Sequence, residues 1–293
     1  MEKITQQIAD TARWALLEEV RTTPKPGLVD CDSNGAHTDM DVCTFVSSAE
    51  ALYPYFKVMA AYGWSDYNNP ERLFEKIRPV GKLAEEAMYQ ATDGVNTHKG
   101  LIFSIGILSA AAAAVYRRKN AFIRNDIFAE EMQMVHTAMQ RELNLTQQKK
   151  ESLTNGEKVY QTYGSLGVRG EALYGYAAVR NLSLPVVEEG VQKHRPFDRI
   201  KIQALLMLMS QVEDSNILSR SNMDMLRHVQ GMSREFLNTG GVYRDDGIET
   251  MKQWDKQFTE WNISPGGAAD LLAITLFIYR LTGGNYGISG KSA

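Results

Sequence analysis

The sequence predicts an all-α fold, with a single compact domain of about ten helices over residues 1–293 and the active site at helix ends. Three observations predict it. Apolar residues recur at steps of three and four along most of the chain. Alternating β-branched runs, the usual sign of strands, are scarce. Helix-start signals are clear where Asn69 precedes Pro70 and Ser264 precedes Pro265.

The individual helices follow from the apolar stripes. The first stripe is Ile4, Ile8, Ala12, Ala15 and Leu16, and the second runs from Val42 to Met59 after an acidic start at Asp39 and Asp41. A third covers 70–87, where Pro79 should bend or interrupt the helix. Residues 144–158 predict an exposed loop with a frayed helix. Further helices are predicted at 98–117, 125–142, 168–181, 186–193, 197–212, 221–238, 246–260 and 265–282.

Composition and charge exclude several classes of protein. A net charge of -3 gives no basic surface, so we expect no nucleic-acid partner. Cys31 and Cys43 are the two cysteines and form no CxxC pattern, which argues against a structural zinc site and fits a reducing, cytoplasmic location. The N-terminus lacks the apolar centre of a signal peptide. The longest apolar run, 101–116, is short for a membrane span and fits a buried helix, so we expect no membrane partner.

Polar segments with glycine and reactive side chains interrupt the helical pattern, each at or near a predicted helix end. Helix N-termini carry free N–H groups and a positive partial charge, which suit phosphate, and glycine lets a backbone approach a ligand closely. These segments are TPKPGLVD (23–30), NGAHTDMD (34–41), GVNTHKG (94–100), GSLGVRGEA (164–172), VEDSNILSR (212–220) and SPGGAADLL (264–272).

Cations at two of these helix starts point to a bound anion. Lys99 follows Thr97, a candidate N-cap, and a cation there costs about 0.3–1 kcal/mol unless an anion offsets it. The spacing of a Walker A motif is absent. Arg169 lies in a glycine-rich start, where it suits a bidentate phosphate contact. The alternative, a surface pair with Glu171, is weak because residues two apart on a helix do not face each other. TPKPGLVD by itself could be only a rigid connector.

Carboxylates cluster in three other segments. Asp39 and Asp41 crowd His37, although an acidic helix start explains them equally well. Asp214 follows an apolar helix, where a solvated turn is the alternative. Asp270 lies among leucines on the first two turns of an apolar helix and needs a partner there. Cations that bind phosphate beside carboxylates that bind magnesium predict a nucleoside polyphosphate site.

The same segments, in this order and spacing, resemble the triphosphoribosyl-dephospho-CoA synthase family over about residues 10–282. GVNTHKG followed by IFS, and the SPGG-AD ending, are the most specific parts. The chain departs from the family at Ser215, which replaces a threonine, and at Ser221 and Asn222, which follow Arg220 in place of a glycine pair. Arg220 is therefore not among the expected site residues.

The resemblance implies an all-helical enzyme that uses Mg²⁺ with ATP as substrate. ATP and 3'-dephospho-CoA would give 2'-(5''-triphosphoribosyl)-3'-dephospho-CoA and adenine. The product would pass to an acyl-carrier-protein transferase, as the prosthetic-group precursor of citrate lyase or malonate decarboxylase. Because an oxocarbenium-like ribose must form, the site needs cations, a carboxylate, an acid and a base.

We therefore expect three groups of site residues. The catalytic residues are His37, His98, Asp39 and Glu171, with the two histidines as the proton-transfer groups. The metal ligands are Asp39, Asp41, Asp214 and Asp270. The ATP-binding residues are Lys25, Gly27, Asn96, Thr97, Lys99, Gly100, Arg169, Gly170, Asn216, Ser264 and Gly266, with Lys25, Lys99 and Arg169 on the triphosphate.

Other functions stay open at this point. An all-helical, metal-dependent nucleotide hydrolase would use the same carboxylates to activate water, and would release phosphate rather than adenine. A helical binding or scaffold protein would use the polar segments only as turns. A related ribosyltransferase could use another acceptor. The thirteen methionines would suit a core or a dimer face equally well, so a homodimer is also open.

Overall fold

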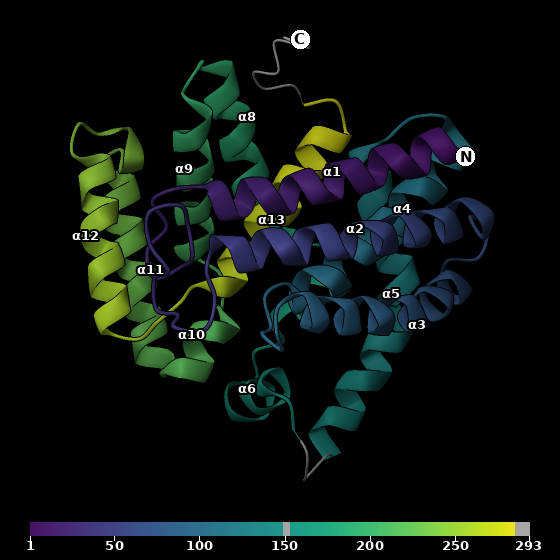
Figure 1. Ribbon diagram of the computed structural model, residues 1–293, viewed down its shortest axis with the longest axis horizontal. Helices are drawn as coiled ribbons and strands as arrows, with labels where there is room; N and C mark the ends of the chain where they lie inside the picture. The colour runs from purple at the N-terminus through teal and green to yellow at the C-terminus, as the bar shows by residue number, and fades with distance from the viewer. Residues whose placement is uncertain (149–152, 285–293) are drawn as a thin grey trace.

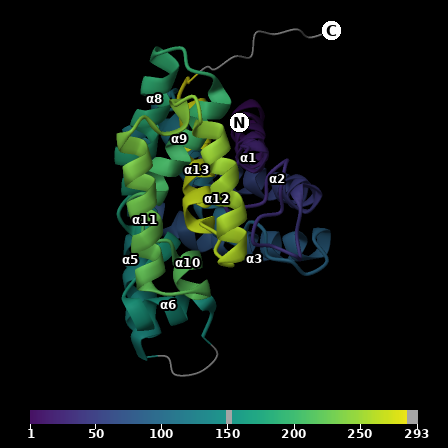
Figure 2. The ribbon, with the colours of Figure 1, turned by 90° about the vertical axis from the view of Figure 1, so that its left-hand side faces the viewer.

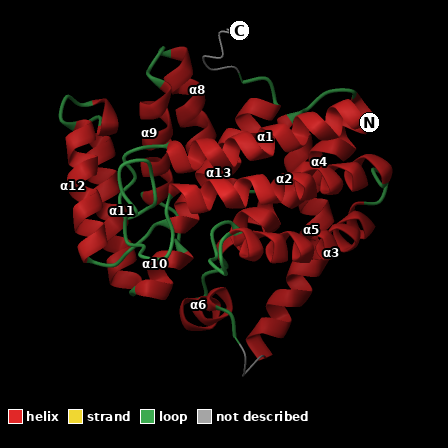
Figure 3. Cartoon of the chain, in the orientation of Figure 1, coloured by secondary structure: helices red, strands yellow, loops and turns green. Residues whose placement is uncertain are grey.

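All regular structure in the computed structural model is helical. The structure describes residues 1–148 and 153–284, and within these ranges it contains no strand (Figure 3). The all-α prediction is therefore confirmed. The α-helices of the described ranges are α1 Glu2–Arg21, α2 Val42–Ser65, α3 Pro70–Ala91, α4 Lys99–Lys119, α5 Arg124–Gln148, α6 Asn155–Tyr163, α7 Gly167–Leu173, α8 Leu184–Gln192, α9 Phe197–Met209, α10 Ser215–Arg220, α11 Met223–Asn238, α12 Gly247–Glu260 and α13 Gly266–Leu281.

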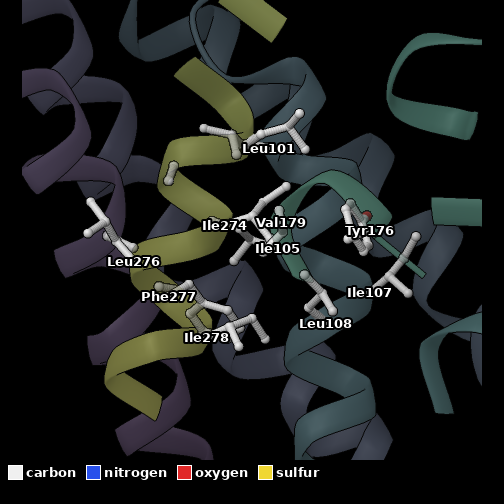
Figure 4. Close-up of a cluster of buried hydrophobic side chains, with 14 of the residues drawn as sticks. Leu101, Ile105, Ile107, Leu108, Tyr176, Val179, Ile274, Leu276, Phe277 and Ile278 are labelled. Carbon is white, nitrogen blue, oxygen red and sulfur yellow. The ribbon is translucent and has the colours of Figure 1, made fainter. Parts of the chain in front are cut away.

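Helix α4 is the centre of the core. It packs against α2, α5, α3, α1 and α13, and Ala110 to Ala114 are fully buried along it (Figure 1). Gly63 of α2 crosses α4 so closely that a Cβ there would lie under 3.0 Å from the Ala110 backbone. Ile274 and Phe277 of α13 meet α4 on another side (Figure 4). The long apolar run thus forms a helix surrounded by other helices.

One helix in the described ranges, α4, is long and apolar enough to cross a membrane by length and composition. Of its most apolar 18-residue window, 78% is buried inside the protein. Such burial is typical of a core helix, and it explains why this helix is apolar on every face.

A smaller core cluster lies between α9, α11 and α12. It contains Ile202, Leu206, Phe236, Val242 and Met251. Helices α11 and α12 both lie on the face that is turned toward the viewer in Figure 2. The rings of Phe236 on α11 and Trp254 on α12 are 5.3 Å apart between their centroids. Aromatic pairs at this distance add to the stabilisation from buried area.

The structure differs from the expected helix boundaries in two places. Of the two outcomes expected at Pro79, an interruption does not occur, because α3 runs unbroken from Pro70 to Ala91. The proline lies on the exposed side of the helix, so the backbone carbonyl that loses its N–H partner can bond to water. The predicted helix 168–181 is broken after Leu173, because Gly175 and Tyr176 have left-handed backbones with φ of 64° and 52°. Helix then resumes through a π-helical turn, Val179–Ser183, directly into α8.

The polar stretch 144–158 is more ordered than expected where it is described. Helix α5 extends to Gln148, and α6 begins at Asn155, inside the predicted loop. Thr154 and Glu157 form a capping box at the α6 start, in which each side chain bonds to the other residue's backbone N–H. Residues 149–152 lie outside the described ranges.

Candidate active site

The starts of α4, α10 and α13 and the loop between α1 and α2 meet in one region, and they bring several of the predicted polar segments together. Asp214 forms the link between α10 and α13. Its Oδ1 accepts backbone N–H bonds from Asn216 at 2.9 Å and Ile217 at 3.3 Å, and its Oδ2 accepts one from Ala268 at 2.8 Å. The carboxylate therefore caps two helices at once. Burial raises the pKa of Asp214, and these N–H donors oppose that rise.

Asp270 lies one turn further along α13 and faces the first turn of α4. Gly100 makes this approach feasible, because a Cβ at position 100 would lie well under 3.0 Å from Asp270 Oδ2. In the described part of the chain Asp270 has no hydrogen-bond or ion-pair partner, unlike Asp214. Burial raises its pKa well above the usual range, and the carboxyl groups of Glu19 and Asp214 raise it further. This is a carboxyl group that would be stabilised by a cation or a proton donor.

Lys25 lies close to this region but is already paired. Its side chain is 1% exposed, and its ammonium forms an ion pair with Glu19 and bonds to the Glu19 carbonyl at 2.9 Å. Its backbone N–H donates to Asp30 Oδ2 at 2.7 Å. Glu19 was missing from the expected site. Sequence could have shown it, because Glu19 continues the apolar stripe of α1 three residues after Leu16.

Arg220 organises the loop that carries His37. Its guanidinium donates to the Ala36 carbonyl at 3.0 Å, to Asn262 Oδ1 at 3.2 Å and to His37 Nδ1 at 3.3 Å. The other ring nitrogen of His37 is 3.0 Å from Ser264 Oγ. Burial lowers the pKa of His37, and the Arg220 charge lowers it further. Arg220 is thus a second residue of this region that was not expected from sequence.

His98 precedes α4 and is 1% exposed. Its Nδ1 is 2.7 Å from Ser48 Oγ on α2, whereas its buried Nε2 has no partner in the described residues. Burial lowers the pKa of His98 to about 3, and the nearby Lys25 charge acts in the same direction. The ring is therefore neutral at physiological pH, and a pKa this low makes it too weak a base to take up a proton readily.

Lys99 and Arg169 form the positive edge of the region. Lys99 Nζ is 2.9 Å from Glu85 Oε2, and Arg169 Nε is 3.9 Å from Glu142 Oε2. The bond to Glu85 raises the pKa of Lys99, while the Arg169 charge lowers it, which shows that the two cations are near each other. Both pairs are partly exposed. Such pairs contribute little to stability, about 0–1 kcal/mol, so a phosphate could displace their carboxylates.

Glu171 supports the turn that ends the predicted helix 168–181. Its Oε2 accepts a bond from the Ala178 N–H at 3.2 Å, across the turn that contains Tyr176. Burial raises the pKa of Glu171. Burial raises the pKa of Tyr176 well above its usual range, and the carboxyl groups of Glu131, Glu171 and Asp270 raise it further.

Several predicted ligand residues have structural explanations. Gly27 is left-handed (φ 69°), donates its N–H to Asp255 at 2.9 Å, and lies against the Ile263 carbonyl. A Cβ on Gly170 would meet Leu166, and one on Gly266 would lie 2.8 Å from the side chain of Asn216, which is exposed. Asn96 accepts a bond from the Lys99 backbone at 3.3 Å, and Thr97 donates to Ser48 at 2.7 Å.

The four predicted metal ligands do not converge. Asp39 is exposed and lies 3.8 Å from His37, while Asp41 caps α2 through a 2.8 Å bond from the Thr44 N–H. Asp214 uses both oxygens on backbone N–H groups. The described residues contain no group of three His, Cys, Asp or Glu side chains that could hold a metal ion. Among the four, Asp270 alone has neither a hydrogen bond nor an ion pair in the described residues, and it could serve as a single carboxylate ligand.

A separate hollow of about 420 Å³ lies at the loop before α2. Three aspartates give it a negative charge, which disfavours a triphosphate. Its lining residues are Asp30, Cys31, Asp32, Ser33, Asn34, Asp41, Val42 and Cys43.

Buried acids, a neutral histidine and exposed cations at helix starts define an all-helical enzyme of the class that handles phosphorylated substrates. Comparison with known proteins gives the particular family. Residues 5–287 match the family described as CitG: ATP:dephospho-CoA triphosphoribosyl transferase. The chain belongs to this family of transferases.

Curated relatives agree over nearly the full length. The chain is 39% identical over 276 residues to a probable 2-(5''-triphosphoribosyl)-3'-dephosphocoenzyme-A synthase of Salmonella gallinarum, covering 92% of this chain and 89% of that protein. A protein of the same name from Vibrio cholerae is 38% identical over 275 residues, covering 94% and 88%. One from Photobacterium profundum is 39% identical over 268 residues, covering 91% and 85%. No solved structure matches the chain.

Proposed function

We propose that this protein transfers the triphosphoribosyl group of ATP to the 2'-hydroxyl of 3'-dephospho-CoA and releases adenine. Family membership supports the reaction. The observation that carries the proposal to particular residues is the approach of Asp270 to Gly100 at the start of α4. It places a carboxyl group without a protein partner against the first turn of α4, the helix that begins at Lys99 directly after His98.

Lys99 and Arg169 would bind the triphosphate. Each is held by one carboxylate, Glu85 or Glu142, in a partly exposed pair. A triphosphate carries more charge than either carboxylate and offers oxygens to both cations, so it would replace these pairs. Lys25 has a different part in this proposal. Its ammonium stays on Glu19, and its charge adds to the effect of burial, which lowers the pKa of His98.

The reaction requires two proton transfers and a group that stabilises the positive charge on the ribose. Asp270 is our candidate for the carboxylate that faces the positive charge which develops on the ribose as adenine leaves. His37 is the candidate base, because its lowered pKa leaves the ring able to accept the proton of the 2'-hydroxyl. Glu171 is the candidate acid for adenine, because burial raises its pKa and so favours the protonated form. The proton lost by the hydroxyl is thereby matched by one delivered to adenine.

Magnesium enters this proposal together with ATP. Mg²⁺ is commonly held by one or two carboxylates plus substrate phosphates, and the unpartnered carboxyl of Asp270 fits that role. The ion would supply positive charge to neutralise the triphosphate. Asp39 and Asp41 are less suited, because one is exposed beside His37 and the other caps α2.

The remaining proposals concern the setting of the reaction. The product would serve as prosthetic-group precursor for the acyl carrier protein of citrate lyase or malonate decarboxylase, through an acyl-carrier-protein transferase. Two exposed free cysteines fit a reducing, cytoplasmic location. A homodimer and a single domain over residues 1–293 both stay predictions.

The test is a chromatographic assay of the purified protein with ATP, magnesium and 3'-dephospho-CoA. We expect free adenine in an amount equal to the modified dephospho-CoA, and none when dephospho-CoA is omitted. Phosphate or ADP without adenine would contradict ribosyl transfer and favour the hydrolase. Adenine in the absence of dephospho-CoA would show that water is the acceptor.

A further inference from the structure

The imidazole ring of His98 is held in one orientation by α2. Phe45 packs edge-on against it, with ring centroids 5.0 Å apart and planes at 87°. Ser48, one turn further along α2 and fully buried, places its Oγ 2.7 Å from Nδ1. The backbone N–H of His98 points to Met88 Sδ at 3.3 Å. Phe45 and Ser48 thus fix the ring, Met88 holds the backbone beside it, and the two ring nitrogens face different surroundings.

The hydroxyl groups around Ser48 determine which nitrogen carries the hydrogen. Thr97 Oγ1 donates to Ser48 Oγ at 2.7 Å. Among the residues that the structure describes, the Ser48 hydroxyl has one remaining acceptor, Nδ1 of His98. Ser48 therefore donates to Nδ1, and a nitrogen that accepts this bond carries no hydrogen. The hydrogen of the neutral ring lies on Nε2.

Nε2–H is a buried donor without a partner. No described residue accepts from it, although the surrounding atoms bury it completely. Buried polar groups are satisfied in nearly all cases, so an unpartnered donor at this helix start indicates a ligand that supplies the acceptor. Lys25, the charged group that acts on His98, is a cation and cannot accept the bond. The acceptor must come from outside the protein.

We propose that Ser48 is a positioning residue that fixes His98 as an Nε2–H donor to an acceptor atom of bound ATP. This inference rests on the proposed function for the identity of the ligand, while the tautomer follows from the protein alone. His98 then stabilises the nucleotide by a hydrogen bond and does not exchange a proton with it. Proton transfer is left to other groups.

Nitrogen-15 NMR of the imidazole tests the tautomer without any turnover. In the wild-type protein we expect a protonated Nε2 and an unprotonated Nδ1, and a mixture of tautomers in Ser48→Ala. Ser47→Ala is the matched control, because Ser47 is the exposed neighbour on the same helix. An Nδ1–H tautomer in the wild type, or an unchanged His98 spectrum in Ser48→Ala, would overturn the proposal.

Adding ATP to the labelled protein separates this proposal from the proposed reaction. We expect the Nε2 signal to shift on ATP binding even if no adenine is released. If the signal shifts but no adenine forms with dephospho-CoA, the donor role stands and the ribosyl transfer fails. If calorimetry shows that ATP binds but the NMR signal of His98 Nε2 does not change, the donor role is overturned.

Substitution of His98 gives a second readout. The amide nitrogen of a glutamine can reach the position of Nε2, whereas that of an asparagine reaches only the position of Nδ1. We expect His98→Asn to lower kcat/KM by about 10²-fold, as for loss of one donor in a site, and His98→Gln to keep much of the activity. Ser48→Ala should lower kcat/KM by about tenfold. Equal loss in His98→Gln and His98→Asn would indicate proton transfer by the imidazole and contradict the proposal.

Discussion

Gly100 and Asp270 are in direct contact between the first turns of α4 and α13, with the carboxylate occupying the space where a side chain at position 100 would begin. We predict that Gly100→Ala displaces this carboxylate and lowers kcat/KM for adenine release by about 10²-fold, because a shift of about 1 Å in a catalytic group has effects of this size. The matched control is Gly81→Ala within α3, where a Cβ would meet only Met59 at 3.8 Å. That variant should keep full activity and gain about 0.5–1 kcal/mol in stability.

Asp270→Asn should stabilise the protein while it inactivates the enzyme. The pKa of Asp270 is raised in the folded state, so its stabilising contribution is full below the unfolded pKa and is lost as pH rises through the folded pKa. The asparagine side chain does not ionise, so the variant does not lose stability as pH rises. The melting temperature of Asp270→Asn should therefore exceed that of the wild type by more at pH 8 than at pH 5. An equal difference in melting temperature at pH 8 and pH 5 would show that ionisation of Asp270 does not destabilise the folded protein. Asp39→Asn, at an exposed carboxylate, is the control.

Lys25→Met should destabilise the fold rather than simply weaken ATP binding. It removes the partner of buried Glu19, and breaking a buried ion pair on one side costs about 3–5 kcal/mol. Urea denaturation measures this change. The double variant Lys25→Met, Glu19→Gln should recover part of the loss, since no unpaired charge remains. If Lys25→Met retained wild-type stability and lost only ATP affinity, Lys25 would be a triphosphate ligand as first expected from sequence.

Lys99→Met and Arg169→Met should each raise the KM for ATP by about tenfold or more, because each removes a charge-assisted phosphate contact. Stability should change by less than about 1 kcal/mol, since both ion pairs are partly exposed. Lys119→Met is the control, because Lys119 forms a comparable exposed pair with Asp126 at 2.6 Å on the opposite end of α4. An unchanged KM for ATP in both Lys99→Met and Arg169→Met would show that the triphosphate binds elsewhere.

Arg220→Gln should shift the acidic limb of the pH–rate profile to higher pH. The Arg220 charge helps to lower the pKa of His37, and a base must be unprotonated to act. Without that charge the pKa of His37 rises, so activity is lost at a higher pH on acidification. Arg227→Gln, at an exposed arginine on α11, should leave the profile in place. An unchanged profile in Arg220→Gln would exclude His37 as the base.

Sequence periodicity predicted most of the fold because long helices depend on local spacing. The stripes of α1, α2 and α3 are visible at three and four residue steps, and Asn69 and Pro70 open α3 as expected. The failures have local causes that periodicity does not encode. The left-handed pair Gly175 and Tyr176 breaks one helix without a proline, and α10 is a single capped turn that depends on Asp214.

The polar segments were predicted correctly as helix ends, yet the roles of individual residues depend on contacts between helices. Asp214 joins its own segment to Ala268, 54 residues later in sequence, by accepting backbone N–H bonds at both helix starts. The partners of Lys25 and His98, Glu19 and Ser48, lie on the buried faces of α1 and α2, where sequence patterns predict only core packing. Such pairings become visible when the helices are placed in space.

A crystal structure with ATP bound is the most direct test of the central claim, that nucleotide binds where α4 meets α13. We predict the ribose beside Asp270, an acceptor atom of ATP on Nε2 of His98, and the triphosphate on Lys99 and Arg169 in place of Glu85 and Glu142. A nucleotide bound instead in the acidic hollow lined by Asp30, Cys31 and Cys43 would contradict the account.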